Sequence, residues 1–332
     1  MKKLVVAAFA ALVASSPQAQ VTIKLGTLAP AGSTWHEILK ELGQRWEQAS
    51  GGQVKLRVYA GGTQGSEGDM VRKMGIGQLQ AASISNIGMH DILPEPQMLS
   101  LPMFFTNEAE VECTFARSRA RIEAAFEAKN YVVLQWSRIG AMSMFCDKPY
   151  RTPAEMAAAD AKVFAWEGDP KSVDAWRAAG FSPVVLSSTD VVPSLQTGMI
   201  NCITNVPLYI LTTRLFEKAD AMVDLPWGYI YGATIIRKDA WEKIAPEVRA
   251  RLQAIAVELG LKVDAEVRKL NVDAVTAMKK QGLQVVSVDP KPWREVMERS
   301  YPVVRGGVVP AAFFDEVKAA RDQCRAGKKK KR

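Results

Sequence analysis

Residues 21–59 read VTIKLGTLAPAGSTWHEILKELGQRWEQASGGQVKLRVY, and this stretch predicts a strand, a helix and a second strand. Residues 21–26 and 54–59 alternate apolar and polar side chains, as half-buried strands do. Between them, apolar residues recur at helical spacing from Trp35 to Trp46, which gives the helix one buried face. The stretch therefore predicts an α/β unit.

The same alternation continues through the first two thirds of the chain. Apolar periodicity predicts helices at 67–74, 109–128, 170–179 and 189–196, and strands at 81–87, 131–135, 162–166, 183–186 and 200–204. Strands that alternate with helices indicate parallel sheets with helices on both faces. The expected fold class is therefore α/β.

A long helical pattern follows at 246–281, beginning at Pro246 and ending before Gly282. A continuous helix of this length spans ~54 Å, which exceeds the size of one domain of ~150 residues. Such a helix would brace two lobes. The alternative is two helices with a kink near Gly260.

The first twenty residues have the pattern of a secretory signal. Lys2 and Lys3 precede an apolar run at 4–14, and a small, polar segment follows at 15–20. The apolar run is shorter than the ~20 residues that a spanning helix needs. We expect export to the periplasm; the alternative is an uncleaved N-terminal anchor.

The formal net charge of +8 lies mostly at the two ends of the chain. Lys2 and Lys3 carry two of these charges and the last five residues carry five, which leaves one for residues 21–327. A nearly neutral body argues against a nucleic-acid partner. The basic tail, 327–332, is expected to be disordered.

Few residues are available for metal binding or catalysis. The two histidines, His36 and His90, lie far apart, and neither has a Cys or carboxylate at ligand spacing. The sequence contains no G-x-S-x-G motif, P-loop or dinucleotide-binding fingerprint. We expect no metal, no cofactor and no enzymatic activity.

The four cysteines leave two possibilities open. Cys113, Cys146, Cys202 and Cys324 form no CxxC pair. In an exported chain they allow two disulfides with three possible pairings. They are equally compatible with buried free thiols, because Cys packs as a small apolar residue.

Several stretches in a specific order and spacing resemble one family. They are 24–27, 65–67, 77–80, 101–105, 152–156 and, most specifically, 179–183 with 195–200. With these the chain resembles the solute receptors of tripartite ATP-independent periplasmic (TRAP) transporters, of the dicarboxylate-binding type, over essentially residues 21–315. The resemblance implies a periplasmic-binding-protein-like fold of two lobes with a substrate cleft between them. It also implies partner permease subunits in the membrane.

By the same resemblance the lobes are discontinuous in sequence. Lobe I would comprise 21–139 and 228–267, and lobe II would comprise 140–227 and 268–326. The long helix would span both lobes.

At the positions where most members bind a carboxylate, this sequence departs from the family pattern. The Arg of the family's "K-I-R-V-P" strand corresponds to Phe164, and the Pro corresponds to Trp166. A second family Arg corresponds to Met142. A buried carboxylate needs a charge or several donors to offset its desolvation, and Phe and Met supply neither. The family Asn corresponds to Asn205, which still offers hydrogen bonds.

The resemblance and these departures predict a largely apolar or aromatic cleft. Its walls would be Trp35, Met142, Phe164, Trp166 and Trp227, with Tyr209 or Tyr231 as further candidates. Its polar groups would be Ser85, Asn86, Asp190 and Asn205.

Three alternatives apply to these assignments. Trp35 is equally compatible with a core position, and Asp190 with a helix cap. Arg138 could swing into the cleft and restore carboxylate binding.

The expected function is that of an extracytoplasmic receptor. It would capture a small organic solute, more apolar or aromatic than the usual carboxylates, and deliver it to the permease as a monomer. The alternative is a periplasmic carrier of a hydrophobic or lipid-like molecule that is not strictly coupled to uptake.

Overall fold

The computed structural model describes residues 20–167, 170–187 and 189–329, so the predicted signal segment lies almost entirely outside it. The strands are β1 (Val21–Thr27), β2 (Val54–Tyr59), β3 (Ala81–Ser85), β4 (Tyr131–Cys146), β5 (Lys162–Trp166), β6 (Ser182–Leu186), β7 (Cys202–Asn205), β8 (Ala221–Arg237) and β9 (Gln284–Val286). The larger helices are α1 (Thr34–Ala49), α2 (Glu67–Gly75), α3 (Glu108–Ala128), α5 (Pro170–Ala178), α9 (Pro246–Lys279), α10 (Pro290–Glu298) and α12 (Ala311–Lys329). Short helices are α4 (Pro153–Ala158), α6 (Val191–Gln196), α7 (Pro207–Thr212), α8 (Lys238–Glu242) and α11 (Tyr301–Gly307), with 3-10 turns η1 (Gly88–Asp91), η2 (Glu95–Ser100) and η3 (Leu215–Glu217). None of the described helices is long and apolar enough to cross a membrane.

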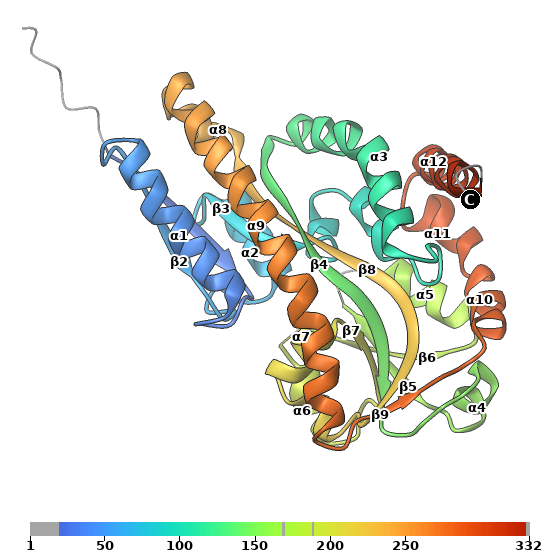
Figure 1. Cartoon of the computed structure of the whole chain (residues 1–332). Helices are drawn as coiled ribbons and strands as arrows, with labels where there is room; N and C mark the ends of the chain where they lie inside the picture. The colour runs from blue at the N-terminus through green and yellow to red at the C-terminus, as the bar shows by residue number, and fades with distance from the viewer. Residues whose placement is uncertain (1–19, 168–169, 188, 330–332) are drawn as a thin grey trace, which may run out of the picture.

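The predicted α/β class is confirmed, with helices flanking a central sheet. The strand order is β2-β1-β3-β8-β4-β7-β5-β6, and β9 pairs with β8. β1, β2 and β3 are mutually parallel at one end, and β5, β6 and β7 are parallel at the other. The long antiparallel pair β4 and β8 joins the two halves (Figure 1).

β4 is much longer than the strand predicted at 131–135. Its pairing with β8 shifts register at three places, between Val133 and Gln135, at Arg138/Gly140 and again just after Met142. Each irregularity reverses the inward and outward alternation of side chains. The period-two pattern therefore fades after residue 135 although the strand continues. The predicted lobe boundaries, 139/140 and 227/228, fall inside β4 and β8, and the division itself stays a prediction.

α9 runs without a break from Pro246 to Lys279, so the kinked alternative is wrong. It packs against α1, β4 and α7 and thus reaches both halves of the sheet (Figure 1). A Cβ on Gly260 would lie 2.4 Å from Gln135 Oε1 and 3.0 Å from the carbonyl oxygen of Trp136. Gly260 therefore serves close helix-to-sheet packing and does not bend the helix.

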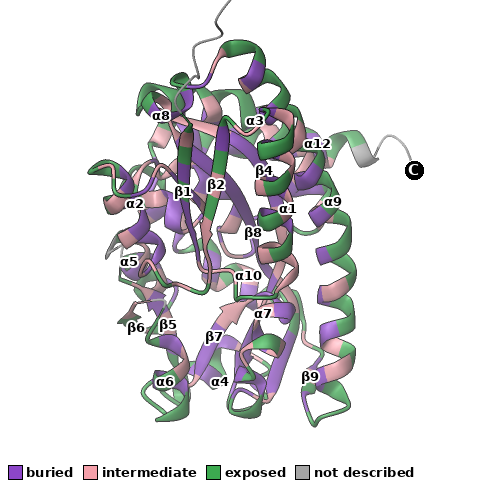
Figure 2. Ribbon diagram, turned by 90° about the vertical axis from the view of Figure 1, so that its left-hand side faces the viewer, coloured by how far each residue is buried: buried purple, intermediate pink, exposed green. Residues whose placement is uncertain are grey.

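Buried side chains concentrate along the central strands and the helix faces that cover them (Figure 2). On one face, α1 and α9 pack on the sheet, and the indole nitrogen of Trp46 donates a hydrogen bond to the Leu252 carbonyl oxygen over 3.0 Å. On the other face, α2, α3 and α12 contribute to a second apolar cluster. The predicted core stripe of α1 is thus confirmed at Ile38, Leu39 and Leu42.

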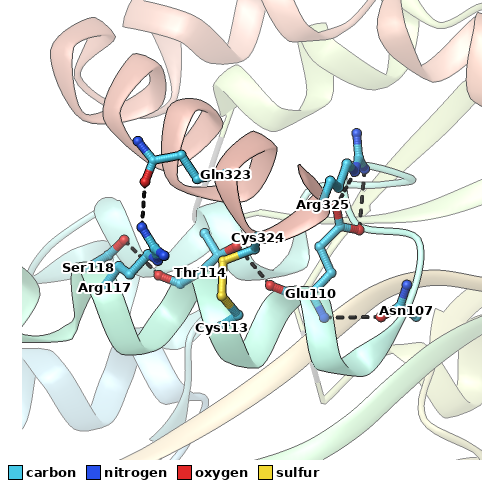
Figure 3. The surroundings of a disulfide bond; sticks show 9 residues. All are labelled: Asn107, Glu110, Cys113, Thr114, Arg117, Ser118, Gln323, Cys324 and Arg325. Carbon is cyan, nitrogen blue, oxygen red and sulfur yellow. Dashed lines mark hydrogen bonds and ion pairs between the residues drawn. A yellow bond between two sulfur atoms is a disulfide. The ribbon is translucent and has the colours of Figure 1, made fainter. Parts of the chain in front are cut away.

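The four cysteines form two disulfides. The sequence alone had left open whether they are paired or free, and which pairs form. Cys146 pairs with Cys202 across the neighbouring strands β4 and β7. Cys113 of α3 pairs with Cys324 of α12, 211 positions apart (Figure 3). The second bond fastens the C-terminal helix to α3, a helix of the half that contains β1–β3.

The C-terminal segment crosses from one half of the molecule to the other. It leaves β9, passes through α10, which packs against α4, and α11, which packs against α5, and ends as α12 on α3 (Figure 1). α12 continues to Lys329, three residues into the segment for which the sequence predicts disorder, and 330–332 lie outside the described residues.

Candidate ligand-binding cavity

A cavity of about 340 Å³ lies between the two halves of the sheet. Its lining includes Thr27 at the end of β1, Ser85 at the end of β3, Trp166 at the end of β5 and Asn205 at the end of β7. The carboxyl ends of the parallel strands of both halves thus meet there. This is the usual place for a ligand in open α/β sheets.

Seven of the nine predicted site residues line this cavity. They are Trp35, Ser85, Met142, Phe164, Trp166, Asn205 and Trp227. Tyr209, one of the two further candidates, also lines it. Whether any of them contacts a ligand stays a prediction.

Asn86, Asp190 and Tyr231 are not among the lining residues. Asn86 is fully buried; its amide nitrogen donates to the Pro96 carbonyl oxygen and to Ser100 Oγ, and its oxygen accepts from the Tyr231 amide. It therefore fastens a loop to β8. Asp190 is exposed and occupies the N-cap position of α6, as the capping alternative expected, but its side chain makes no capping hydrogen bond. Tyr231 is buried against Phe115.

The aromatic lining follows from strand geometry. Phe164 and Trp166 are two positions apart on β5 and share one face of the strand, as predicted, and that face is the cavity wall. His90 meets the Trp166 ring edge-on at 6.3 Å. Trp35 is partly buried; it packs against the core cluster of α1 and also lines the cavity, so a core position does not exclude it from the cavity wall.

Trp227 and Trp176 form a stacked pair at the cavity wall. Their ring centroids are 5.6 Å apart and the planes differ by 9°. Phe181 and Trp293 meet Trp227 edge-on behind the pair. The sequence singled out Trp227 but missed Trp176, because nothing in the local pattern of α5 distinguishes a residue that faces a cavity from one that faces the core.

Glu67 is the one carboxylate among the described lining residues. It occupies the first position of α2, after the N-cap Ser66. Its two carboxyl oxygens accept hydrogen bonds of 2.7 Å each from the backbone amide and the hydroxyl of Ser85. Burial raises the pKa of Glu67, and the hydrogen bonds from Ser85 and Gly88 only partly oppose this. The sequence patterns considered above did not single out Glu67, although a glutamate that directly follows an N-cap residue was a usable signal.

No Lys, Arg or His is found among the described residues that line the cavity. Arg138, the cation that could have entered it, is held elsewhere. Its backbone amide and Nε donate to Asp264 over 2.5 and 3.1 Å, and its guanidinium pairs with Glu112. Its neighbours Ser137 and Ile139 line the cavity, whereas Arg138 is not among the lining residues.

Comparison with known proteins identifies the family to which the chain belongs. Residues 25–306 match the bacterial extracellular solute-binding protein family 7, DctP. The chain belongs to this family. The resemblance to TRAP solute receptors is thereby confirmed. The general role is that of an extracytoplasmic protein that binds a small organic solute and works with membrane permease components.

Relatives and solved structures agree over nearly the whole chain. The sialic acid-binding periplasmic protein SiaP of Vibrio cholerae is 22% identical over 313 residues, covering 91% of this chain and 94% of its own. A TRAP periplasmic solute-binding protein of Pseudomonas putida F1 with bound D-glucuronate superposes with a TM-score of 0.81 at 22% identity, covering 91% and 97%. Another, from Desulfovibrio salexigens with bound orotic acid, has a TM-score of 0.82 at 15% identity, covering 92% and 99%. The predicted two-lobed fold is confirmed by these likenesses.

Proposed function

We propose that this TRAP receptor captures an uncharged organic solute, more apolar or aromatic than the organic acids named for its neighbours. The observation that carries the proposal is the charge of the cavity lining: one buried carboxylate and, among the described residues, no cation. The relatives bind acids, and the fold alone would lead one to expect an acid here as well.

The physical argument rests on the cost of burying a carboxylate. Removing an ionised carboxylate from water costs several kcal/mol, which a protein offsets with a cation or with several hydrogen-bond donors. Phe164 and Met142 occupy the positions that the family resemblance assigns to arginines, and Arg138 is committed to Asp264 and Glu112. An ionised Glu67 would in addition repel an anion.

The cavity offers matching groups for a neutral ring-bearing solute. Trp35, Phe164 and Trp166 provide aromatic surface, and apart from Glu67 the polar lining residues carry uncharged hydroxyl or amide groups. The oxygen of Asn205 accepts a 2.8 Å hydrogen bond from the Val206 amide, and no partner for its amide nitrogen is found among residues 20–167, 170–187 and 189–329. That nitrogen would donate to a carbonyl or hydroxyl oxygen of the solute.

Three further predictions belong to the same proposal. The protein would be exported through residues 1–20, act as a monomer, and release its solute unchanged to the permease subunits. If it were instead a carrier not coupled to uptake, cells lacking the permease subunits would acquire the solute as well as the parent strain does.

Matched pairs of compounds test the proposed ligand class. We expect indole-3-ethanol to raise the melting temperature and indole-3-acetate, which differs in carrying a carboxylate, to leave it unchanged. A burial penalty of several kcal/mol corresponds to a difference of at least ~100-fold in affinity. Micromolar binding of the acid, or of simple dicarboxylates, would show that the proposal is wrong.

A further inference from the structure

One wall of the cavity comes from the C-terminal segment, which the sequence did not connect with the site. Met297 at the end of α10, Ser300 at the start of α11, and Val304 and Val308 of α11 and its C-cap all line the cavity. They lie more than 100 residues from α5, which they face across it. Contacts at such separations leave no periodic signal in the sequence.

This wall is apolar. Val304 and Val308 belong to the same buried cluster as Ala175 of α5. Ser300 is 1% exposed, and its hydroxyl is already used, because it donates to the Met297 carbonyl oxygen over 2.6 Å. The polar atom of the one hydroxyl residue in this wall is therefore satisfied within the protein.

Further apolar residues line the cavity beside this wall, together with the hydroxyl residues Ser100 and Ser172. We call this end of the cavity the C-terminal compartment, lined by Leu101, Ala175, Trp176, Met297, Val304 and Val308. Pro102 and Trp227 adjoin it. No charged side chain is among these residues, whereas Ser85 and Asn205 come from strand ends and Glu67 from the first position of α2.

We propose that the C-terminal compartment is a distinct subsite that binds an alkyl or aryl extension of the solute, while the polar end of the solute remains at the strand ends. The inference rests on the proposed function, because it assumes an uncharged, largely apolar solute. It adds the class of ligand: an amphiphilic molecule with one short polar end and one apolar end.

Several contacts hold the wall in place. The hydroxyl of Tyr301 on α11 donates to the Pro102 carbonyl oxygen over 2.9 Å. Arg305 pairs with Asp315 across the corner between α11 and α12 through bonds of 2.7 and 2.6 Å. α12 is itself fastened to α3 by the Cys113–Cys324 disulfide (Figure 3). These contacts attach the wall to the rest of the molecule on both sides of α11.

The test is a series of 4-alkylphenols from phenol to 4-hexylphenol, titrated by calorimetry into the full chain with its disulfides intact. In the wild type, each methylene that enters the compartment should raise the affinity about fourfold, the equivalent of ~0.8 kcal/mol per buried CH2. Val304→Phe fills the compartment, so the gain in affinity per methylene should stop at a shorter alkyl chain than in the wild type; the comparison uses this limiting chain length and not the affinity for phenol itself.

Ala312→Phe is the matched control, because it adds the same ring at an exposed position of α12. Val308→Phe serves as the second filling variant if Val304→Phe does not fold, as judged by circular dichroism. If phenol binds but affinity does not rise with chain length, or if Val304→Phe and Ala312→Phe behave alike, the subsite is wrong and the proposed function stands. If neither phenol nor any alkylphenol binds while acids do, the proposed function itself fails.

Discussion

Of the two disulfides, Cys113–Cys324 should contribute more to the free energy of unfolding. We consider the double variant Cys113→Ser/Cys324→Ser. The bond closes a loop of 211 residues between α3 and α12, whereas Cys146–Cys202 closes one of 56. Removing either bond enlarges the conformational freedom of the unfolded chain, and the longer loop contributes more.

The magnitude follows from the loop lengths. Loop-closure entropy gives about 5 kcal/mol for the longer loop and about 4 kcal/mol for the shorter one. In the native state α12 keeps other contacts with its surroundings: Arg325 pairs with Glu110, and the guanidinium of Arg321 lies 4.0 Å from the centroid of the Phe104 ring. α12 should therefore stay docked in the variant. For a chain of this length, a loss of about 5 kcal/mol lowers Tm by roughly 8 °C, and a loss of about 4 kcal/mol lowers it by roughly 6 °C.

The assay is calorimetric unfolding of the wild type, of Cys113→Ser/Cys324→Ser and of the control Cys146→Ser/Cys202→Ser. Mass spectrometry without reductant first establishes that the remaining disulfide has formed. We expect both variants to lose stability, the first more than the second. A first variant as stable as the wild type, or a larger loss in the control, would refute the reasoning.

Three further predictions concern packing, charge and pH. Gly260→Ala should lower the free energy of unfolding by about 1–3 kcal/mol despite the better helix propensity of Ala, because the new Cβ meets the Trp136 carbonyl oxygen. The control is Gly75→Ala, whose new Cβ would meet no atom within 4 Å and which should therefore be neutral or slightly stabilising. Urea unfolding measures the stability of both variants. Phe164→Arg should bring a cation to the cavity and raise the affinity for indole-3-acetate at least tenfold, measured by calorimetry; no gain would argue that Phe164 does not face the ligand. Because burial raises the pKa of Glu67, the folded state holds this proton more tightly than the unfolded chain, so stability attributable to Glu67 falls as pH rises through the raised pKa. In Glu67→Gln the fall of stability as the pH rises above 4.5, the ordinary pKa of a glutamate, should be smaller in urea unfolding; an unchanged pH dependence would contradict it.

Much of the fold was predictable because local patterns decide it. The alternation at 21–26 and the apolar stripe of α1 are properties of neighbouring residues, and the structure confirms both. α9 was predictable for the same reason, with a proline at its start and a glycine after its end. The length of β4 was not, since its irregular register breaks the two-residue period that identifies a strand.

The cavity was predictable only in part. Phe164 and Trp166 were found because they occupy known positions of a family pattern on one strand face. Asn86 was misplaced because a polar residue at a strand end can equally anchor a loop, and its hydrogen bonds show that it does. The wall from α11 was missed altogether, because Val304 and Val308 meet α5 only through the path of the folded chain.

The most direct test of the central claim is the chemical nature of the solute that this receptor carries. We would release the small molecules retained by protein purified from its native periplasm and identify them by mass spectrometry. Each would then be titrated back by calorimetry into wild type and Phe164→Arg. The cation-free cavity predicts an uncharged, ring-bearing or amphiphilic compound that binds the wild type more tightly than Phe164→Arg. A carboxylate that binds the wild type at micromolar affinity would contradict the account.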